Sequence, residues 1–183
     1  MHIPKTGGRS FYKILESQYG IGNVQYLPRV DFLKRLEEQS IDSFLEGEDR
    51  VIHCHFRYTE LANYIDSSND KLITWFRDPV ERVISNHRFF VKRLQDDPST
   101  HSHVHKQNIH RKNESLLDYA AMEENQNIIS KYISDASFEN FFFIGFLESF
   151  SEDLKELGQM LAWDSPTIPH ENSNQSFKRA IGY

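Results

Sequence analysis

The chain has 183 residues, of which 38% are hydrophobic, and this length fits one domain with a sizeable core. Its 21 Lys and Arg residues stand against 27 Asp and Glu residues, and the net charge of −6 argues against nucleic acid or an anionic membrane surface as a partner. The single cysteine, Cys54, and the lack of a signal-like or long apolar segment predict a soluble, cytoplasmic protein without internal disulfides.

Short apolar runs rich in β-formers alternate with longer helical stretches, the pattern typical of βαβ units. Strands are expected at residues 51–55, 72–76 and 141–144, and helices at residues 8–19, 31–38, 58–65, 79–94, 114–132 (with a break allowed within it) and 151–163. Because the run at 72–76 is almost wholly apolar, it is expected at the centre of the sheet. Asp78 before Pro79 is typical of a helix start, and Ser149 with Glu152 resembles a capping box. The pattern predicts one α/β domain over residues 1–183, with three layers (α/β/α) around a mostly parallel central sheet.

The first motif is the segment His-Ile-Pro-Lys-Thr-Gly-Gly-Arg-Ser-Phe at residues 2–11, which leads into the first helix. Glycines allow close approach of the backbone to a phosphate, and the N–H groups at a helix start bind anions. Lys5 adds a full positive charge. The lysine precedes the glycine pair, unlike the order in the Walker loop, which disfavours ATP or GTP hydrolysis. A plain glycine turn with an exposed lysine is the alternative.

This segment resembles the 5′-phosphosulfate-binding loop of the carbohydrate sulfotransferases that include the heparan sulfate O-sulfotransferases. The resemblance implies a P-loop-like sulfotransferase architecture and 3′-phosphoadenosine 5′-phosphosulfate (PAPS) as the sulfuryl donor. It also implies that Lys5 contacts the oxygen bridging phosphate and sulfate. The 5′-phosphate would then be held by Thr6, Gly7, Gly8, Arg9 and Ser10.

The second motif, His53-Cys54-His55, closes the strand expected at 51–55. The two-residue period of a strand places both histidines on one face, and the ordinary histidine pKa of about 6.5 suits a general base. His55 lies nearer the carboxyl end of the strand and is therefore preferred as the base. Hydrogen-bonded core histidines and a zinc site are the alternatives, although no third ligand follows at zinc-site spacing. The motif is similar to that of the heparan sulfate 2-O-sulfotransferases, which implies His55 as the catalytic base and His53 as a supporting or substrate-binding residue.

The third motif, residues 75–86, places Arg77 at the carboxyl end of a strand, the edge where ligands of open α/β sheets bind. Its guanidinium can bind a phosphate with two hydrogen bonds, and Ser85, eight residues later, adds a hydroxyl. An ion pair of Arg77 with Asp78 is the alternative. The segment resembles the family's 3′-phosphate site, in which an Arg and a Ser at this spacing hold the ribose 3′-phosphate. Glu81 and Arg82 are interpreted as surface or fold-supporting residues.

Two polar segments and one apolar segment indicate a function less specifically than the three motifs do. Residues 96–113 contain four histidines and several basic residues, and we interpret them as a long loop that could contact an anionic acceptor, with a solvated or disordered loop as the alternative. Residues 141–150 resemble the family's strand and turn before the last helix, but a buried strand explains them equally well and no chemistry is assigned to them. Residues 170–178 are interpreted as a loop that closes over the adenine and the 3′-phosphate, with an ordinary surface loop as the alternative.

The three motifs together predict a PAPS-dependent sulfotransferase acting on a hydroxyl acceptor, for which the resemblance implies a carbohydrate. No metal, nucleic acid or membrane partner is expected. A nucleotide or sugar kinase of P-loop type is one rival, and it would need a Walker loop and a carboxylate that binds Mg²⁺. A non-catalytic binding module on a degenerate sulfotransferase scaffold is the other. No pattern in the sequence identifies the acceptor or the oligomeric state.

Overall fold

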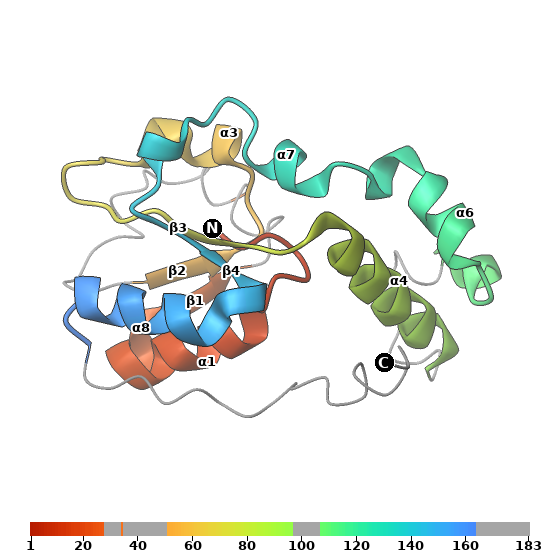
Figure 1. Ribbon diagram of the computed structural model, residues 1–183, viewed down its shortest axis with the longest axis horizontal. Helices are drawn as coiled ribbons and strands as arrows, with labels where there is room; N and C mark the ends of the chain where they lie inside the picture. Colours follow the sequence, from red (N-terminus) through yellow and green to blue (C-terminus); the bar gives the residue numbers. More distant parts are fainter. Residues whose placement is uncertain (28–33, 35–50, 97–106, 164–183) are drawn as a thin grey trace.

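The computed structural model describes residues 1–27, 34, 51–96 and 107–163, and Figure 1 shows them as an α/β arrangement. Four strands form two parallel pairs, β1 with β2 and β3 with β4. The strands are β1 (Val24–Leu27), β2 (Val51–Cys54), β3 (Ile73–Phe76) and β4 (Phe143–Phe146). The α-helices are α1 (Gly8–Tyr19), α3 (Tyr58–Leu61), α4 (Pro79–Gln95), α6 (Leu116–Ala121), α7 (Ile128–Tyr132) and α8 (Phe150–Met160). Short 3₁₀ turns lie at Ile21–Asn23, Ala62–Tyr64, Ile109–Arg111, Glu123–Asn125, Phe138–Asn140 and Leu147–Ser149.

The first residues of the chain lie between the two strand pairs. The Met1 amino group donates a hydrogen bond to the carbonyl of Ile73 in β3 (3.0 Å), and the His2 N–H donates to the carbonyl of Cys54 in β2 (2.7 Å). The Leu72 carbonyl accepts from Phe142 on the other side (2.9 Å), so β3 has neighbours at both of its edges. The two pairs are thus joined by the segment that leads into the candidate phosphate loop. Among the described strands β3 pairs with β4 alone, so its central position in a larger sheet stays a prediction.

One hydrophobic core joins both strand pairs to two helices. It contains residues from α1, α8 and three of the strands: Phe11, Ile14, Leu15, Val24, Trp75, Phe143, Leu154 and Leu157. Figure 1 shows α1 and α8 side by side beneath the strands, with α3 above them, which agrees with the expected layering. A Cβ atom at Gly145 would lie 2.4 Å from the Trp75 ring, so only glycine allows this packing of β4 on β3. The predicted α/β fold with parallel strands is confirmed.

Helix α4 starts and packs as its sequence indicates. Asp78 is the N-cap and its carboxylate accepts from the Glu81 N–H (2.9 Å), while Pro79 occupies the first turn. Arg82 is buried and donates to the Asn125 carbonyl (3.0 Å), which ties α4 to the segment between α6 and α7. The N-cap prediction and the fold-supporting role of Arg82 are therefore confirmed. Among the described residues no helix is long and apolar enough to cross a membrane.

Some predicted element boundaries differ from the structure. The helix expected at 114–132, with a break allowed within it, is divided into α6 and α7 by a turn that includes the buried Asn125. The capping box at Ser149 is wrong, because the Ser149 hydroxyl pairs with Asp153 (3.0 Å) and makes no cap hydrogen bond. Asp153 also accepts from the Phe146 N–H (2.6 Å), which makes it the polar anchor of the turn before α8. The strand β1 was not predicted, and the helix expected at 31–38 lies outside the described residues apart from position 34.

Candidate functional site

The loop before α1 is a tight turn in which the backbone packs closely against neighbouring side chains. Lys5 and Gly7 both have positive φ angles (73° and 83°), and the buried Thr6 hydroxyl donates to the Ile3 carbonyl (2.8 Å). A Cβ atom at Gly8 would lie 1.8 Å from the His2 ring, and one at Gly7 would lie 2.7 Å from a Leu147 methyl carbon. Gly7 is the N-cap of α1 and has no side chain to satisfy the first N–H groups of the helix, which leaves them available to an anion.

Positive charge gathers beside this loop. The Lys5 ammonium lies 4.2 Å from the centre of the Phe89 ring of α4. Burial first, and then the cations Arg9 and Arg77, lower the pKa of Lys5 below its ordinary value. The Arg77 guanidinium donates to the Lys5 carbonyl (3.4 Å) and pairs with Glu81 (3.5 Å), so it joins the first motif to the third. The ion-pair partner of Arg77 is thus Glu81, one turn into α4, while Asp78 caps that helix.

The candidate base is held by the same amino-terminal segment. His55 Nδ1 lies 3.0 Å from the His2 carbonyl oxygen, and because a carbonyl only accepts, Nδ1 must carry the proton. Its Nε2 lone pair is then free to accept a proton. Burial lowers the pKa of His55 below 6.5, against an opposing effect of the hydrogen bond to His2, so the ring is neutral at pH 7. The position and tautomer suit a general base.

His53 and His2 form the buried side of this histidine group. The His2 ring lies 4.8 Å from the His53 ring and 4.4 Å from the His55 ring, so both strand histidines share one face as predicted. His53 is 5% exposed and lies against Tyr12 and Tyr26, and burial lowers its pKa to about 3. This burial favours a supporting role, and contact of His53 with a substrate stays a prediction. Among the residues with described positions, no three His, Cys, Asp or Glu side chains are arranged to hold a metal ion.

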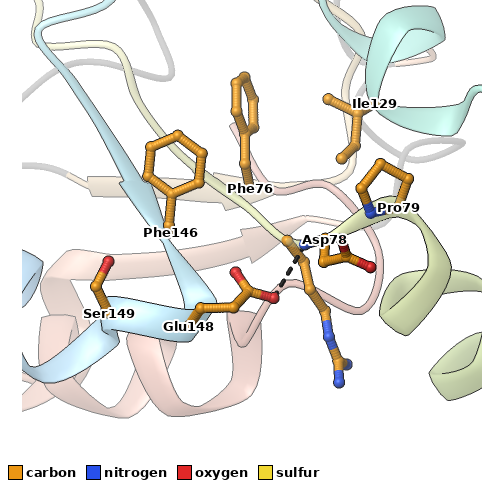
Figure 2. A pocket seen from close by; sticks show the side chains of 8 residues that line it. Phe76, Asp78, Pro79, Ile129, Phe146, Glu148 and Ser149 are labelled. Atoms are coloured by element: carbon orange, nitrogen blue, oxygen red, sulfur yellow. Dashed lines mark hydrogen bonds between the residues drawn. The ribbon is translucent and has the colours of Figure 1, made fainter.

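A largely apolar cavity of about 560 Å³, wide open to solvent, lies beside Arg77, at the carboxyl ends of β3 and β4. Figure 2 shows Phe76 and Phe146 from these strands, with Ile129 of α7 and Pro79 of α4 nearby. The Phe76 and Phe146 rings are 5.9 Å apart and nearly perpendicular, and Glu148 closes the rim by accepting from the Asp78 N–H (3.0 Å). The cavity could have been expected, because ligands of parallel sheets bind at this edge.

The structure brings the main predicted residues to one region. Lys5, Thr6, Gly7, Gly8, Arg9 and Ser10 form the loop and the first turn of α1. Ser85 is four residues before Phe89 on α4 and therefore lies on the helix face that contacts Lys5. His2 is the residue that sequence reasoning missed; neither of its ring nitrogens has a hydrogen-bond partner within the described structure. The expected loop at 170–178 and residues 97–106 of the histidine-rich segment lie outside the described residues.

Comparison with solved structures finds the mouse sulfotransferase SULT7A1 complexed with PAP. The two chains have 18% sequence identity and a TM-score of 0.45, with 98% of this chain and 60% of the mouse chain covered. The present chain thus spans about 60% of that protein's length. No protein-family model and no curated protein matches the sequence. A similarity of this size leaves the function of the chain to the chemistry of its own residues.

Proposed function

We propose that this chain is an enzyme that transfers the sulfuryl group of PAPS to a hydroxyl group, with a carbohydrate as the acceptor. One observation carries the proposal: the backbone carbonyls of residues 2 and 5 accept hydrogen bonds from His55 and Arg77, which are 53 and 72 residues away in sequence. The candidate base and the candidate 3′-phosphate ligand therefore converge on the candidate 5′-phosphosulfate loop. Such convergence is expected of one active site.

The donor set of the loop region fits an anion with several charges. Lys5, Arg9 and Arg77 are close enough that the two arginines lower the lysine's pKa, and a bound phosphate would relieve this repulsion. Ser85 and the first N–H groups of α1 add neutral donors. The apolar cavity beside Arg77 is open to solvent, and its volume of about 560 Å³ leaves room for a nucleoside next to a phosphate.

Each residue then has a distinct task. Bound PAPS supplies an activated sulfuryl group whose bond to the 5′-phosphate oxygen breaks as the acceptor oxygen bonds to sulfur. His55 Nε2 takes the acceptor's hydroxyl proton, and the His2 carbonyl keeps the ring in the required tautomer. Lys5 neutralises the charge that develops on the departing phosphate oxygen. Arg77 and Ser85 hold the 3′-phosphate, so that adenosine 3′,5′-bisphosphate and the sulfated acceptor are the products.

Tyr26 supports a carbohydrate as the acceptor. Its ring is 50% exposed, lies 6.3 Å from the His55 ring in an edge-on arrangement, and is supported by Tyr12 at 6.0 Å. An exposed aromatic ring gives the apolar C–H face of a sugar a surface to pack on while the hydroxyls stay free. In this position it would present a sugar hydroxyl towards the base.

The donor assignment is tested by calorimetry with adenosine 3′,5′-bisphosphate, AMP, ATP and GTP. The bisphosphate should bind most tightly, and Arg77→Gln should weaken it roughly tenfold to hundredfold, the effect of losing a charged hydrogen bond, while AMP binding changes little. Lys92→Gln removes an exposed cation from α4, the helix that follows Arg77, and serves as the control. Equal affinity of the wild type for the bisphosphate and AMP would refute the assignment.

The acceptor assignment is tested by sulfuryl transfer from labelled PAPS to oligosaccharides and to a simple phenol. Transfer to the oligosaccharides is expected, and Tyr26→Ala should raise the acceptor KM without changing the KM for PAPS. Tyr64→Ala, at a similarly exposed tyrosine in the turn after α3, is the control. Preference for the phenol would overturn the carbohydrate assignment and leave the donor assignment standing.

A further inference from the structure

An exposed aromatic residue of α4 contacts the lysine on which the proposed chemistry depends. The Lys5 ammonium lies 4.2 Å from the centre of the Phe89 ring, a distance typical of a cation–π contact. Phe89 is 42% exposed, so burial in the core does not account for a large apolar side chain at this position. The positive φ of Lys5 (73°) shows that the backbone of this residue has an uncommon conformation for a residue other than glycine.

The face of α4 that carries Phe89 also carries a candidate donor ligand. Ser85 and Phe89 are four residues apart, so their side chains lie one above the other on the helix, about 6 Å apart along its axis. Arg82, three residues before Ser85, is buried and bonded to the Asn125 carbonyl, which fixes the rotation of α4 about its axis. The helix therefore holds the aromatic ring and the serine in a constant relation to the loop.

The electrostatic surroundings of Lys5 give the aromatic ring a function. Arg9 of α1, Arg77 at the end of β3 and His2 all lie near Lys5, and the carboxylate of Glu81 pairs with Arg77. Repulsion from the two arginines would favour rotamers in which the lysine extends into solvent. A ring face attracts a cation through its quadrupole and competes poorly with a fully charged phosphate oxygen. Phe89 thus offers a binding position that the ammonium can leave when a stronger anionic partner arrives.

We propose that Phe89 is a positioning residue for Lys5: its ring face holds the ammonium beside the phosphate loop, ready to meet the developing charge of the leaving oxygen. The proposal rests on the proposed sulfuryl transfer. It predicts that replacing Phe89 lowers kcat more than it changes KM, because the lysine acts on charge that appears during the reaction. Removing the ring should lower kcat roughly twofold to thirtyfold, the rate ratio equivalent to the energy of a cation–π contact.

The contact itself is tested by NMR without any turnover. In protein labelled with ¹³C-lysine, the Lys5 ε-methylene signal, assigned with Lys5→Arg, should be shifted upfield by the ring current of Phe89. Phe89→Leu should remove this shift, and Phe89→Trp should keep it. Phe138→Leu makes the same change at another exposed phenylalanine and should leave the signal unchanged. A Lys5 signal that is the same in wild type and Phe89→Leu would overturn the proposal whether or not the chain is a sulfotransferase.

The catalytic consequence is tested by steady-state kinetics on the same variants. Phe89→Leu should lower kcat by the stated factor with the KM for PAPS within about twofold of wild type, and Phe89→Trp and Phe89→Tyr should restore kcat. An unchanged kcat in an active Phe89→Leu enzyme would overturn the positioning role even if the ring-current shift is lost. A wild-type chain that transfers no sulfuryl group would instead overturn the proposed function and the catalytic part of the inference, while the NMR result would still report the contact.

Discussion

Replacing His55 by asparagine or by alanine separates its two roles. The amide nitrogen of asparagine can take the place of Nδ1 and donate to the His2 carbonyl, but it cannot accept a proton as Nε2 does. Both variants should therefore lose about 10²–10⁴-fold in transfer rate, the usual contribution of a positioned general base. Only His55→Ala should also lose the hydrogen bond, which contributes about 0.5–1.5 kcal/mol to the free energy of unfolding. For a chain of this size, the Tm of His55→Ala should be roughly 2–4 °C lower than that of His55→Asn for each kcal/mol lost.

Sulfuryl transfer from labelled PAPS, measured between pH 4.5 and 8, tests the base assignment. Protonated imidazole cannot accept the hydroxyl proton, so the wild-type rate should fall as pH drops through the pKa of His55, which burial holds below 6.5. The residual activity of both variants should lack this acidic limb. If His55→Asn keeps the wild-type rate within threefold, His55 is not the base. Calorimetry with adenosine 3′,5′-bisphosphate serves as the control, because both variants should still bind it.

Three further outcomes are expected. The free energy of unfolding, measured by urea titrations, should fall as pH drops from 6.5 towards about 3. The folded-state pKa of His53 lies below its unfolded value, so the unfolded chain binds more protons in that range. His53→Phe should reduce this pH dependence. Lys5→Ala should lower kcat more than it weakens adenosine 3′,5′-bisphosphate binding, and equal losses in both would remove Lys5 from the leaving-group role. Gly145→Ala should destabilise the fold by about 1–3 kcal/mol in the same titrations, since its Cβ would lie 2.4 Å from the Trp75 ring; an unchanged midpoint would contradict that packing.

Local chemistry made some elements predictable. Helix α1 was expected at residues 8–19 and is found there, because Gly7 precedes it with a left-handed backbone and Gly20 ends it with another positive φ. The start of α4 follows from the Asp78-Pro79 pair, in which the carboxylate caps the helix and the proline supplies no N–H that would need a partner. Signals of this kind depend on one or two neighbouring residues.

Other features depended on hydrogen-bond partners that the sequence pattern did not identify. Strand β1 has four residues, and it exists because it pairs in parallel register with β2, whose first residue is 27 positions after its own first residue. The expected capping box at Ser149 failed because Asp153 binds both that hydroxyl and the Phe146 N–H. The strand depends on a partner distant in sequence, whereas the cap was lost to a competing carboxylate four residues after the serine.

His2 shows why the side chains of a site can be predicted from the sequence while the backbone groups that position them are missed. His2 contributes a backbone carbonyl to His55, and every residue type has that carbonyl, so no motif can indicate it. The same is true of the Lys5 carbonyl that accepts from Arg77. These two carbonyls belong to the segment that also joins β2 to β3, so the connection between the strand pairs and the assembly of the site are one structural feature. A change at Gly8, whose missing Cβ leaves room for the His2 ring, should therefore disturb the base and the phosphate loop together, whereas a change at His55 or Arg77 removes one function.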